Sequence, residues 1–525
     1  MSTNIYILSL YMKNKFICDK SLTFQECELA ILRNAVDLAE NKMGKQLVNT
    51  PDVQQMIKIV EDFINRKNLI CYGGVAIDAL LPESDKIYDK NVELSDYDFY
   101  TPNALEDAKE LADIFVEKGY TEVEAKAGAH YGTFKVFCNF LAVADLTYMP
   151  PELFKVLKKE SIRVKGILYC PPNFLKMAMY LELSRPAGQI DRFEKVFKRL
   201  TLLNKYYPIT SANCGEVDFQ RPMENEETEK ESEIYGNVKN TFVNQGVVFF
   251  GGMAMNLFSY YLPKKKQKSV RHIADFDVLS IDPLGTCEIV KERLLDIDVK
   301  HVKIVPHKAI GEIIPEHYEI LVNKETIAFV YKPIACHSYN VISIKGQQLK
   351  VATIDTMLSF YLAFLYTERP YYTIFADRIL CMSKFLFDVQ QQNRLAQKGL
   401  LRRFSITCYG HQESVEEMRS HKNEMFQQLK GKRGTKEYDE WFLNYKPSIS
   451  NKKEDKSETT DETTDETTDE SETTDKSETT DKSETTDKKR KPRKIKKTKK
   501  RKRSNNTTSH KIFNFKFFKS KKNRR

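Results

Sequence analysis

The chain has 525 residues, of which 41% are hydrophobic, and a formal net charge of +10 at pH 7. This length suffices for two or three domains with buried cores. No stretch has membrane-spanning length, which excludes a membrane-spanning protein. The ten cysteines show neither Cys-x-x-Cys pairs nor regular spacing, which excludes zinc ribbons and disulfide frameworks. We therefore expect an intracellular protein in a reducing compartment, with no membrane among its partners.

The excess positive charge lies in the C-terminal tail, because acidic and basic residues balance over residues 1–447. Repeated Glu-Thr-Thr-Asp units fill Glu458–Asp487, and the basic block Lys488–Arg503 follows them. Neither part has enough apolar residues to form a core, so residues 447–525 are predicted to be disordered. We expect this tail to tether RNA nonspecifically and to be dispensable for catalysis.

The elements preceding the tail alternate between helical and mixed segments. Apolar residues at helical spacing predict a helical N-terminal region over residues 1–65, and later helices over Asn173–Leu203 and residues 349–430. The acidic segment Pro222–Glu233 predicts an exposed loop, after which a second mixed segment begins near Gly246. Strands of the first mixed segment are predicted at Asn68–Tyr72, Tyr97–Tyr100, Phe134–Cys138 and Phe140–Leu146.

The first mixed segment contains a strand, a Gly73-Gly74 turn, an apolar helix, a polar loop and then Asp96-Tyr97-Asp98. Alternate residues of a strand share a face, so Asp96 and Asp98 should point the same way. Two neighbouring carboxylates repel each other unless a cation joins them, and oxygen ligands suit Mg²⁺. The glycines allow backbone N–H groups to approach a triphosphate at a helix N-terminus.

A third carboxylate, Asp145, lies in an otherwise apolar run, where its burial is costly unless it binds something. Three carboxylates on adjacent strands can hold two metal ions about 3.5–4 Å apart for phosphoryl transfer. The alternative is a buried ion pair between Asp145 and a lysine such as Lys135.

This order of motifs resembles the polymerase-β-like nucleotidyltransferase superfamily. The layout of residues 25–430, including Ser184-Arg185-Pro186 and Arg192–Pro208, resembles more specifically the poxvirus-type poly(A) polymerase catalytic subunits of large DNA viruses. The resemblance implies ATP as the substrate, an RNA 3′ end as the acceptor and Mg²⁺ or Mn²⁺ as the cofactor. It also implies that the catalytic metal ligands are Asp96, Asp98 and Asp145. The spacing from Gly74 to Asp96 is longer than usual, and Pro82–Glu93 is interpreted as a tolerated surface insertion.

The residues expected to bind the nucleotide lie in two places. Gly73, Gly74 and Ser95 belong to the catalytic segment, whereas Lys195 and Lys198 lie on a later basic helix face. A basic face of this kind can also be a plain solvated surface, which is the alternative for the two lysines.

A second copy of the motif begins at Val247–Asn256 and continues to Asp275 and Asp277. Aligning the two His-Tyr pairs without gaps, at His130 and His317, places Lys332 where the first copy has Asp145. A lysine there would compete with metal ions, so the second copy is predicted to be catalytically dead and to form a channel wall or a subunit interface. Its aspartates would then pair internally, with the neighbouring Arg271 or His272 as candidates.

The predicted fold is α+β, with tandem nucleotidyltransferase-like domains (mixed sheets flanked by helices) of which the second is degenerate. The predicted parts are a helical region 1–65, a catalytic domain 66–205, a degenerate domain 206–430 and a disordered tail 447–525. The function expected from the resemblance is template-independent addition of AMP to mRNA 3′ ends, in the virion or the host cytoplasm. A homodimer or a separate processivity partner is compatible with this function. The alternatives are a nucleotidyltransferase with another acceptor and a noncatalytic RNA-binding scaffold.

Overall fold

The computed structural model describes residues 23–48, 50–89, 97–211, 214–215, 217–221, 228–267, 274–393 and 396–447. Ser95, Asp96 and the tail from residue 448 lie outside these ranges. Within them, no helix combines the length and the apolar character that a membrane crossing needs.

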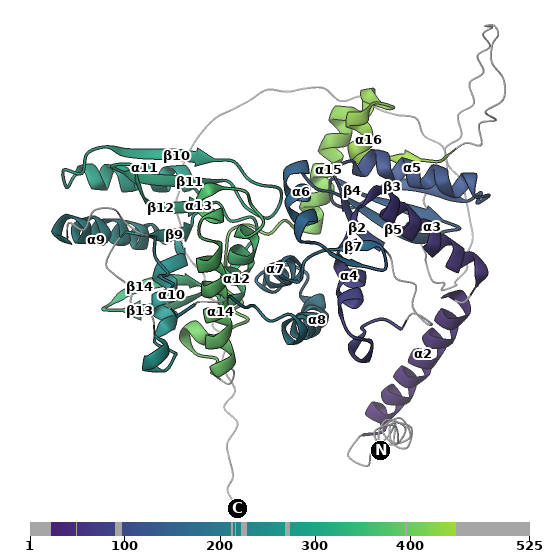
Figure 1. Cartoon of the computed structure of the whole chain (residues 1–525), viewed down its shortest axis with the longest axis horizontal. Helices are drawn as coiled ribbons and strands as arrows, with labels where there is room; N and C mark the ends of the chain where they lie inside the picture. Colours follow the sequence, from purple (N-terminus) through teal and green to yellow (C-terminus); the bar gives the residue numbers. More distant parts are fainter. Residues whose placement is uncertain are drawn as a thin grey trace, which may run out of the picture. The chain divides into compact units, whose positions relative to one another are not determined.

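Strands β1 to β7 from the first half of the chain and the late strand β16 form a mixed sheet with the order β16-β3-β4-β5-β2-β1-β7-β6. Figure 1 labels β2, β3, β4, β5 and β7 of this sheet. Its strands are β1 (Ile70–Cys71), β2 (Tyr97–Thr101), β3 (Val123–Ala127), β4 (Thr133–Cys138), β5 (Leu141–Tyr148), β6 (Ile162–Val164), β7 (Ile167–Tyr169) and β16 (Asn444–Tyr445). Its helices are α3 (Pro51–Lys67), α4 (Gly73–Leu80), α5 (Ala104–Glu117), α6 (Pro151–Glu160), α7 (Pro172–Leu183) and α8 (Phe193–Tyr206). The predicted strands are therefore present, with ends that differ by a few residues.

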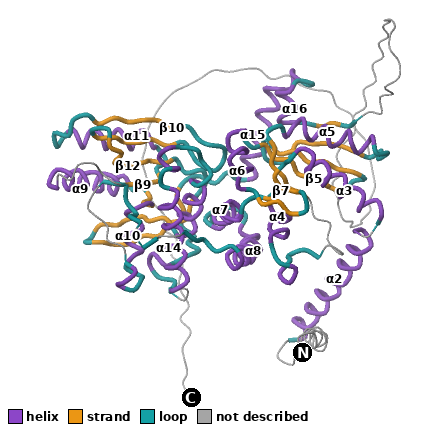
Figure 2. Tube along the Cα trace, in the orientation of Figure 1, coloured by secondary structure: helices purple, strands orange, loops and turns teal. Residues whose placement is uncertain are grey.

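The later part of the chain forms a second mixed sheet with the order β10-β11-β12-β9-β8-β14-β13-β15. Figure 2 draws the strands of both sheets in orange. The strands of the second sheet are β8 (Val248–Phe250), β9 (Phe276–Leu279), β10 (Val302–His307), β11 (His317–Val322), β12 (Glu325–Tyr331), β13 (His337–Ile344), β14 (Gln347–Ala352) and β15 (Cys408–Tyr409). Its helices are α9 (Thr228–Gln245), α10 (Gly251–Ser259), α11 (Pro283–Leu295), α12 (Ile354–Phe364), α13 (Pro370–Thr373) and α14 (Ala376–Gln392). The later helices α15 (Val415–Leu429) and α16 (Lys436–Phe442) lie beside the first sheet, where α16 packs against β3.

The two sheets have the same strand order once the edge strands β16 and β15 are set aside. In the first sheet β2 pairs antiparallel with β1 and parallel with β5. In the second sheet β9 pairs antiparallel with β8 and parallel with β12. The chain thus contains two mixed sheets, each flanked by helices, with matching strand pairings. This confirms the predicted tandem α+β architecture.

The end of the described chain returns to the first sheet. Strand β16 pairs with β3, with Asn444 opposite Lys126 and Tyr445 opposite Ala125. The Tyr445 hydroxyl also donates to an Asp113 carboxylate oxygen at 2.7 Å. An edge strand with unpaired N–H and C=O groups gains a partner in this way. The domain limits 66–205 and 206–430 remain a proposal. Strand β16 shows that residues after 430 also contribute to the first sheet.

Two sequence expectations are wrong. The segment after residue 227 is not a loop, because α9 begins at Thr228. The cysteines do form disulfides, Cys214–Cys381 and Cys336–Cys408. Their partners are 167 and 72 residues apart in sequence, so a search for short, regular spacing does not detect them.

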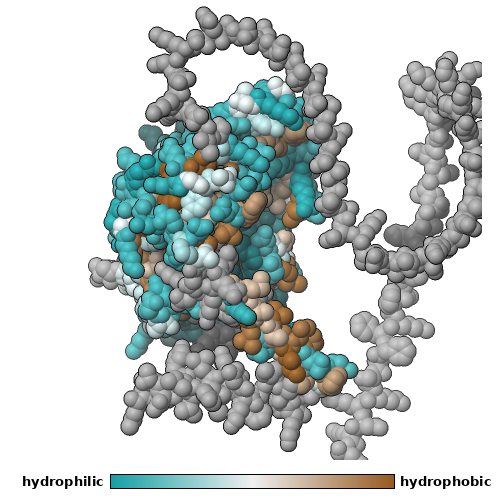
Figure 3. All heavy atoms as spheres, turned by 90° about the vertical axis from the view of Figure 1, so that its right-hand side faces the viewer, coloured by the Kyte–Doolittle hydropathy of each residue, from teal (hydrophilic) through white to brown (hydrophobic). Residues whose placement is uncertain are grey.

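Helix α2 (Phe24–Val48) lies in the predicted N-terminal helical region, but many of its apolar side chains are exposed. Hydrophobic side chains gather on the part of the surface that carries this helix (Figure 3). They are Phe24, Leu29, Ile31, Leu32, Val36, Leu38 and Met43. The apolar periodicity therefore identified the helix correctly without identifying what it packs against.

Candidate active site and its degenerate copy

The first candidate site lies where β2 and β5 run side by side. Their parallel register sets Asp98 directly opposite Asp145, as the strand pattern of the sequence required. The third predicted ligand, Asp96, lies outside the described residues. Two carboxylates on neighbouring strands concentrate negative charge at one point of the sheet, which favours a bound cation.

Asp145 has two different oxygen environments. Its Oδ2 accepts a hydrogen bond from the Lys135 ammonium, which lies opposite it on β4. Its Oδ1 is buried and has no hydrogen-bond partner among the described residues. The ion pair considered as the alternative for Asp145 is thus formed, but it leaves one carboxylate oxygen available as a ligand.

A divalent metal ion fits this donor set, because hard carboxylate oxygens are the ligands that Mg²⁺ and Mn²⁺ prefer. Among the described residues no group of three or more His, Cys, Asp or Glu side chains could hold a metal. The site therefore depends on the position of Asp96, and the metal-binding triad remains a prediction.

The Gly73-Gly74 turn lies against the carboxylate pair. Gly73 has a φ of +70°, and a Cβ added to it would lie 2.4 Å from Asp98 Oδ2. Only glycine combines this backbone conformation with so close an approach. The following helix α4 has Tyr72 as its N-cap residue, without a side-chain hydrogen bond to the cap. The first N–H groups of a helix have no partner within the helix and can bind an anionic ligand.

The loop after α4 is anchored rather than merely tolerated. The backbone N–H groups of Ile87 and Tyr88 donate to Asp78 Oδ1 at 2.8 and 3.2 Å. Asp78 itself is buried in α4. A Cβ on Gly74 would lie 2.0 Å from the Tyr88 hydroxyl, so the tyrosine covers the turn. Sequence reasoning missed this role, although a carboxylate within the apolar helix after the glycines was a signal for it.

Helix α8 holds the same loop from the other side, but not through the residues predicted to bind nucleotide. Arg199 donates from Nη2 to the Tyr88 hydroxyl at 2.8 Å. Lys198 instead pairs with Glu194 at 2.6 Å on an exposed helix face, and Lys195 is also exposed. Arg199 is thus the α8 cation that the described contacts connect to the Gly-Gly turn, and the role of the two lysines remains a prediction.

The second copy repeats the turn geometry. Gly251 has a φ of +71°, and a Cβ on it would lie 2.1 Å from Asp277 Oδ2. The register of β9 and β12, however, places Phe329 opposite Asp277. The position of the third carboxylate is therefore occupied by Phe329, and the prediction of Lys332 is wrong.

The error arose from the His-Tyr alignment. Lys135 faces Asp145 in the first hairpin and Glu319 faces Phe329 in the second, so the hairpins themselves correspond. His130 precedes β4, whereas His317 is already the first residue of β11. The two His-Tyr pairs are therefore not equivalent positions, because Lys135 follows His130 by five residues and Glu319 follows His317 by only two, which shifts the ungapped count by three. The conclusion that the third carboxylate is lost still follows, because phenylalanine binds no metal.

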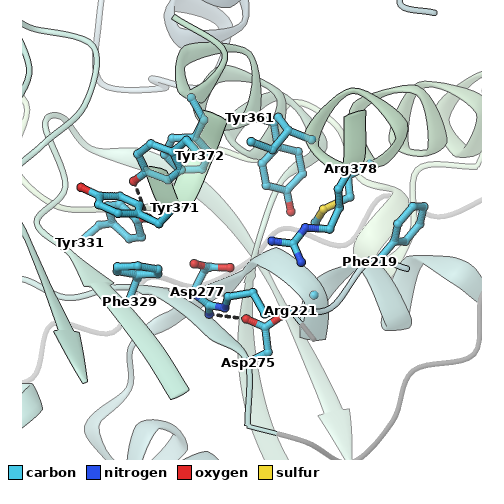
Figure 4. A pocket seen from close by; sticks show the side chains of 14 residues that line it. Phe219, Arg221, Asp275, Asp277, Phe329, Tyr331, Tyr361, Tyr371, Tyr372 and Arg378 are labelled. Atoms are coloured by element: carbon cyan, nitrogen blue, oxygen red, sulfur yellow. Dashed lines mark hydrogen bonds and ion pairs between the residues drawn. The ribbon is translucent and has the colours of Figure 1, made fainter. Parts of the chain in front are cut away.

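The aspartates of the second copy face arginines (Figure 4). Arg221 forms an ion pair with Asp275, and its backbone N–H also donates to Asp275 Oδ2 at 2.8 Å. The Arg221 guanidinium lies 4.8 Å from the Phe329 ring centroid. Arg378 lines the cavity that also contains Asp275 and Asp277. The suggested partners Arg271 and His272 lie outside the described residues. A built-in guanidinium thus supplies the positive charge that a metal ion would supply elsewhere.

Burial raises the pKa of Asp277 to about 6, although Arg221 and Arg378 favour the charged form. An unfolded aspartate titrates near pH 3.9, so between about pH 4 and 6 the folded state binds more protons. We therefore expect the contribution of Asp277 to stability to fall as the pH rises through this window. Asp277→Asn does not titrate, and its stability relative to wild type should rise by about 2 kcal/mol from pH 4 to 7. Urea unfolding at the two pH values tests this; an unchanged difference would contradict it.

Comparison with known proteins finds a family match over the segment that contains the first candidate site. Residues 58–189 match the family model described as poly(A) polymerase catalytic subunit. An African swine fever virus protein (strain Badajoz 1971 Vero-adapted) described as a poly(A) polymerase catalytic subunit is 36% identical over 172 residues, 31% of this chain and 36% of the viral protein. An Acanthamoeba polyphaga mimivirus protein of the same description is 31% identical over 275 residues, 49% of this chain and 45% of that protein. The matched regions thus span less than half the length of these relatives.

The crystal structure of the Megavirus polyadenylate synthase has a similar fold. The TM-score is 0.65 at 21% identity, and the match covers 78% of this chain and 85% of that one. Residues 58–189 are therefore similar to the poly(A) polymerase catalytic subunit family, within a fold that resembles a viral polyadenylate synthase over most of its length.

Proposed function

We propose that the chain is a template-independent poly(A) polymerase that transfers AMP from ATP to the 3′ end of mRNA. The observation that carries this proposal is the placement of Asp98 opposite Asp145, beside the positive-φ Gly73 at the start of α4. This arrangement lies within the segment that matches the poly(A) polymerase family model.

Each part of the first site has a role in this reaction. Asp98 and Asp145, together with Asp96, would hold Mg²⁺ or Mn²⁺. When bound, such ions favour deprotonation of the RNA 3′-hydroxyl and neutralise the charge of the departing pyrophosphate. The N–H groups at the start of α4 would bind triphosphate oxygens. A bond forms between the RNA 3′-oxygen and the α-phosphorus of ATP, while the bond from that phosphorus to the pyrophosphate breaks.

The second copy has another role. Its Asp275 and Asp277 face Arg221 and Arg378, and Phe329 takes the third position, so it is inactive in this proposal. It would form a wall of the RNA channel or a subunit interface. A homodimer or a separate processivity partner would act there. Such a protein would work in the virion or the host cytoplasm, since its matched relatives belong to large DNA viruses.

Extension of a labelled RNA primer with each nucleoside triphosphate singly tests the proposal. We expect a long ladder with ATP, little extension with the other three, and no products when divalent metal is chelated. Metal-dependent ATP turnover without primer extension would instead favour a different acceptor. The absence of any turnover with Mg²⁺ or Mn²⁺ would favour a noncatalytic scaffold.

A further inference from the structure

A cavity of 280 Å³ lies beside α8, and its lining residues include none of the aspartates of the two sites. Its lining residues include Phe197, Gln397, Arg402, Arg403 and Phe404. We propose that this cavity binds one nucleobase of the RNA acceptor, upstream of the 3′ end. The proposal rests on the proposed function, because it assigns a second contact to the same substrate.

Two phenylalanines give the cavity faces on which a base can stack. Phe197 and Phe404 are 39% and 47% exposed, and their ring centroids lie 6.1 Å apart in an edge-to-face arrangement. Exposed phenylalanine rings gain from being covered, and every base offers a flat π face that can cover them. This kind of contact accepts any base. A polymerase needs this, because its acceptor changes from transcript sequence to adenylates as the tail grows.

The position of the two rings is fixed by a buried ion pair. Arg403 donates from Nε and Nη2 to the carboxylate of Asp355 at 2.8–3.1 Å, and Asp355 is almost completely buried. The Arg403 guanidinium lies 5.0 Å from the ring centroids of both Phe197 and Phe404. Since Asp355 neutralises Arg403, this arginine acts as a positioning residue for the rings and not as a phosphate ligand.

Exposed cations lie at the cavity and along α8. Arg402 is an exposed lining residue, and the exposed Lys398 directly follows the lining residue Gln397 in sequence. On α8, Phe197 and Arg199 flank the buried stripe of the helix on opposite sides, because they are separated by about 200° of rotation. The exposed Lys195 and Lys198 lie on the surface between these two sides. A phosphate backbone could therefore run over α8 from the Tyr88 loop, which Arg199 contacts, to the cavity.

The combination favours RNA over an apolar protein partner. Cationic side chains beside aromatic platforms are typical of single-stranded nucleic acid sites, whereas a docking surface for an apolar peptide is poor in charge at its centre. The volume lies just below the range of about 300–1,000 Å³ usual for whole ligands, which suits a single base better than a whole nucleotide.

The test compares Phe404→Ala with wild type by fluorescence anisotropy, using oligo(A) RNA without ATP, and by primer extension. Loss of one base–aromatic stack should weaken RNA binding and raise the KM for RNA by about tenfold, with the KM for ATP unchanged. Phe404→Tyr, which keeps the ring, should bind like wild type. Phe140→Ala is the matched control, because Phe140 is 83% exposed on the β4–β5 turn and lines no part of the cavity.

A set of primers with a single abasic position, moved along the RNA, identifies the base involved. One abasic position should weaken wild-type binding about as much as Phe404→Ala does, and it should have no further effect on that variant. Wild-type extension together with unchanged RNA binding by Phe404→Ala would overturn the cavity proposal alone. Failure of wild type to extend any primer would overturn the proposed function, and the cavity assignment with it.

Discussion

Gly73→Ala is expected to lower the rate of AMP incorporation by about a hundredfold, the effect of displacing a catalytic group by roughly 1 Å. The added Cβ would lie 2.4 Å from Asp98 Oδ2, so either the carboxylate or the turn must move. The φ of +70° adds backbone strain for any residue with a side chain. Single-turnover incorporation at saturating ATP and primer measures the effect on chemistry.

Gly251→Ala provides the matched control in the second copy. Gly251 has a φ of +71°, and its added Cβ would lie 2.1 Å from Asp277 Oδ2. Both variants should therefore lose a similar amount of stability, roughly 1–3 kcal/mol. Only Gly73→Ala should lose the chemical rate. Equal losses of rate would show that the effect is general destabilisation, or that the second copy takes part in catalysis.

Arg221→Met is expected to destabilise the protein by about 3–5 kcal/mol, the usual cost of removing one partner from a buried ion pair. Asp275 would lose its guanidinium partner while remaining buried, and Asp277 would lose a favourable charge. Methionine retains much of the side-chain volume against Phe329, so the effect reports mainly on charge. Chemical denaturation at neutral pH measures the change in the free energy of unfolding.

Arg293→Met is the control for this change, because Arg293 pairs with Asp296 where both side chains are about 60% exposed. Removal of a surface ion pair should alter stability by less than about 1 kcal/mol. A loss for Arg221→Met as small as that of Arg293→Met would contradict the assignment of Arg221 as the internal cation of the second copy.

The first site could be predicted because its signals are local. Gly73-Gly74 before an apolar helix requires a tight turn, and the alternation of a strand fixes which face Asp98 occupies. Asp145 was found as a carboxylate in an apolar run, and its register opposite Asp98 agrees with that reasoning. The tandem architecture also followed, since both copies preserve the same turn signal.

The rest depends on contacts between distant segments. Arg221 lies in no motif, yet the fold brings it to Asp275. The identity of Phe329 as the third-position residue depends on the strand register, which shows that the two His-Tyr pairs are not equivalent positions. The partner of β3 is supplied by Asn444–Tyr445, far along the chain. Each of these contacts joins segments that are far apart in the sequence, so no local periodicity predicts it.

The most direct measurement compares primer extension with ATP by wild type, Asp98→Asn and Asp277→Asn. The two aspartates occupy equivalent positions beside Gly73 and Gly251, and asparagine keeps the side-chain shape while removing the charge. We expect Asp98→Asn to lower the rate by about 10³-fold or more, as loss of a metal-binding carboxylate should, and Asp277→Asn to extend primers at the wild-type rate. Retained extension by Asp98→Asn, or loss of extension by a folded Asp277→Asn, would contradict the assignment of catalysis to the first copy.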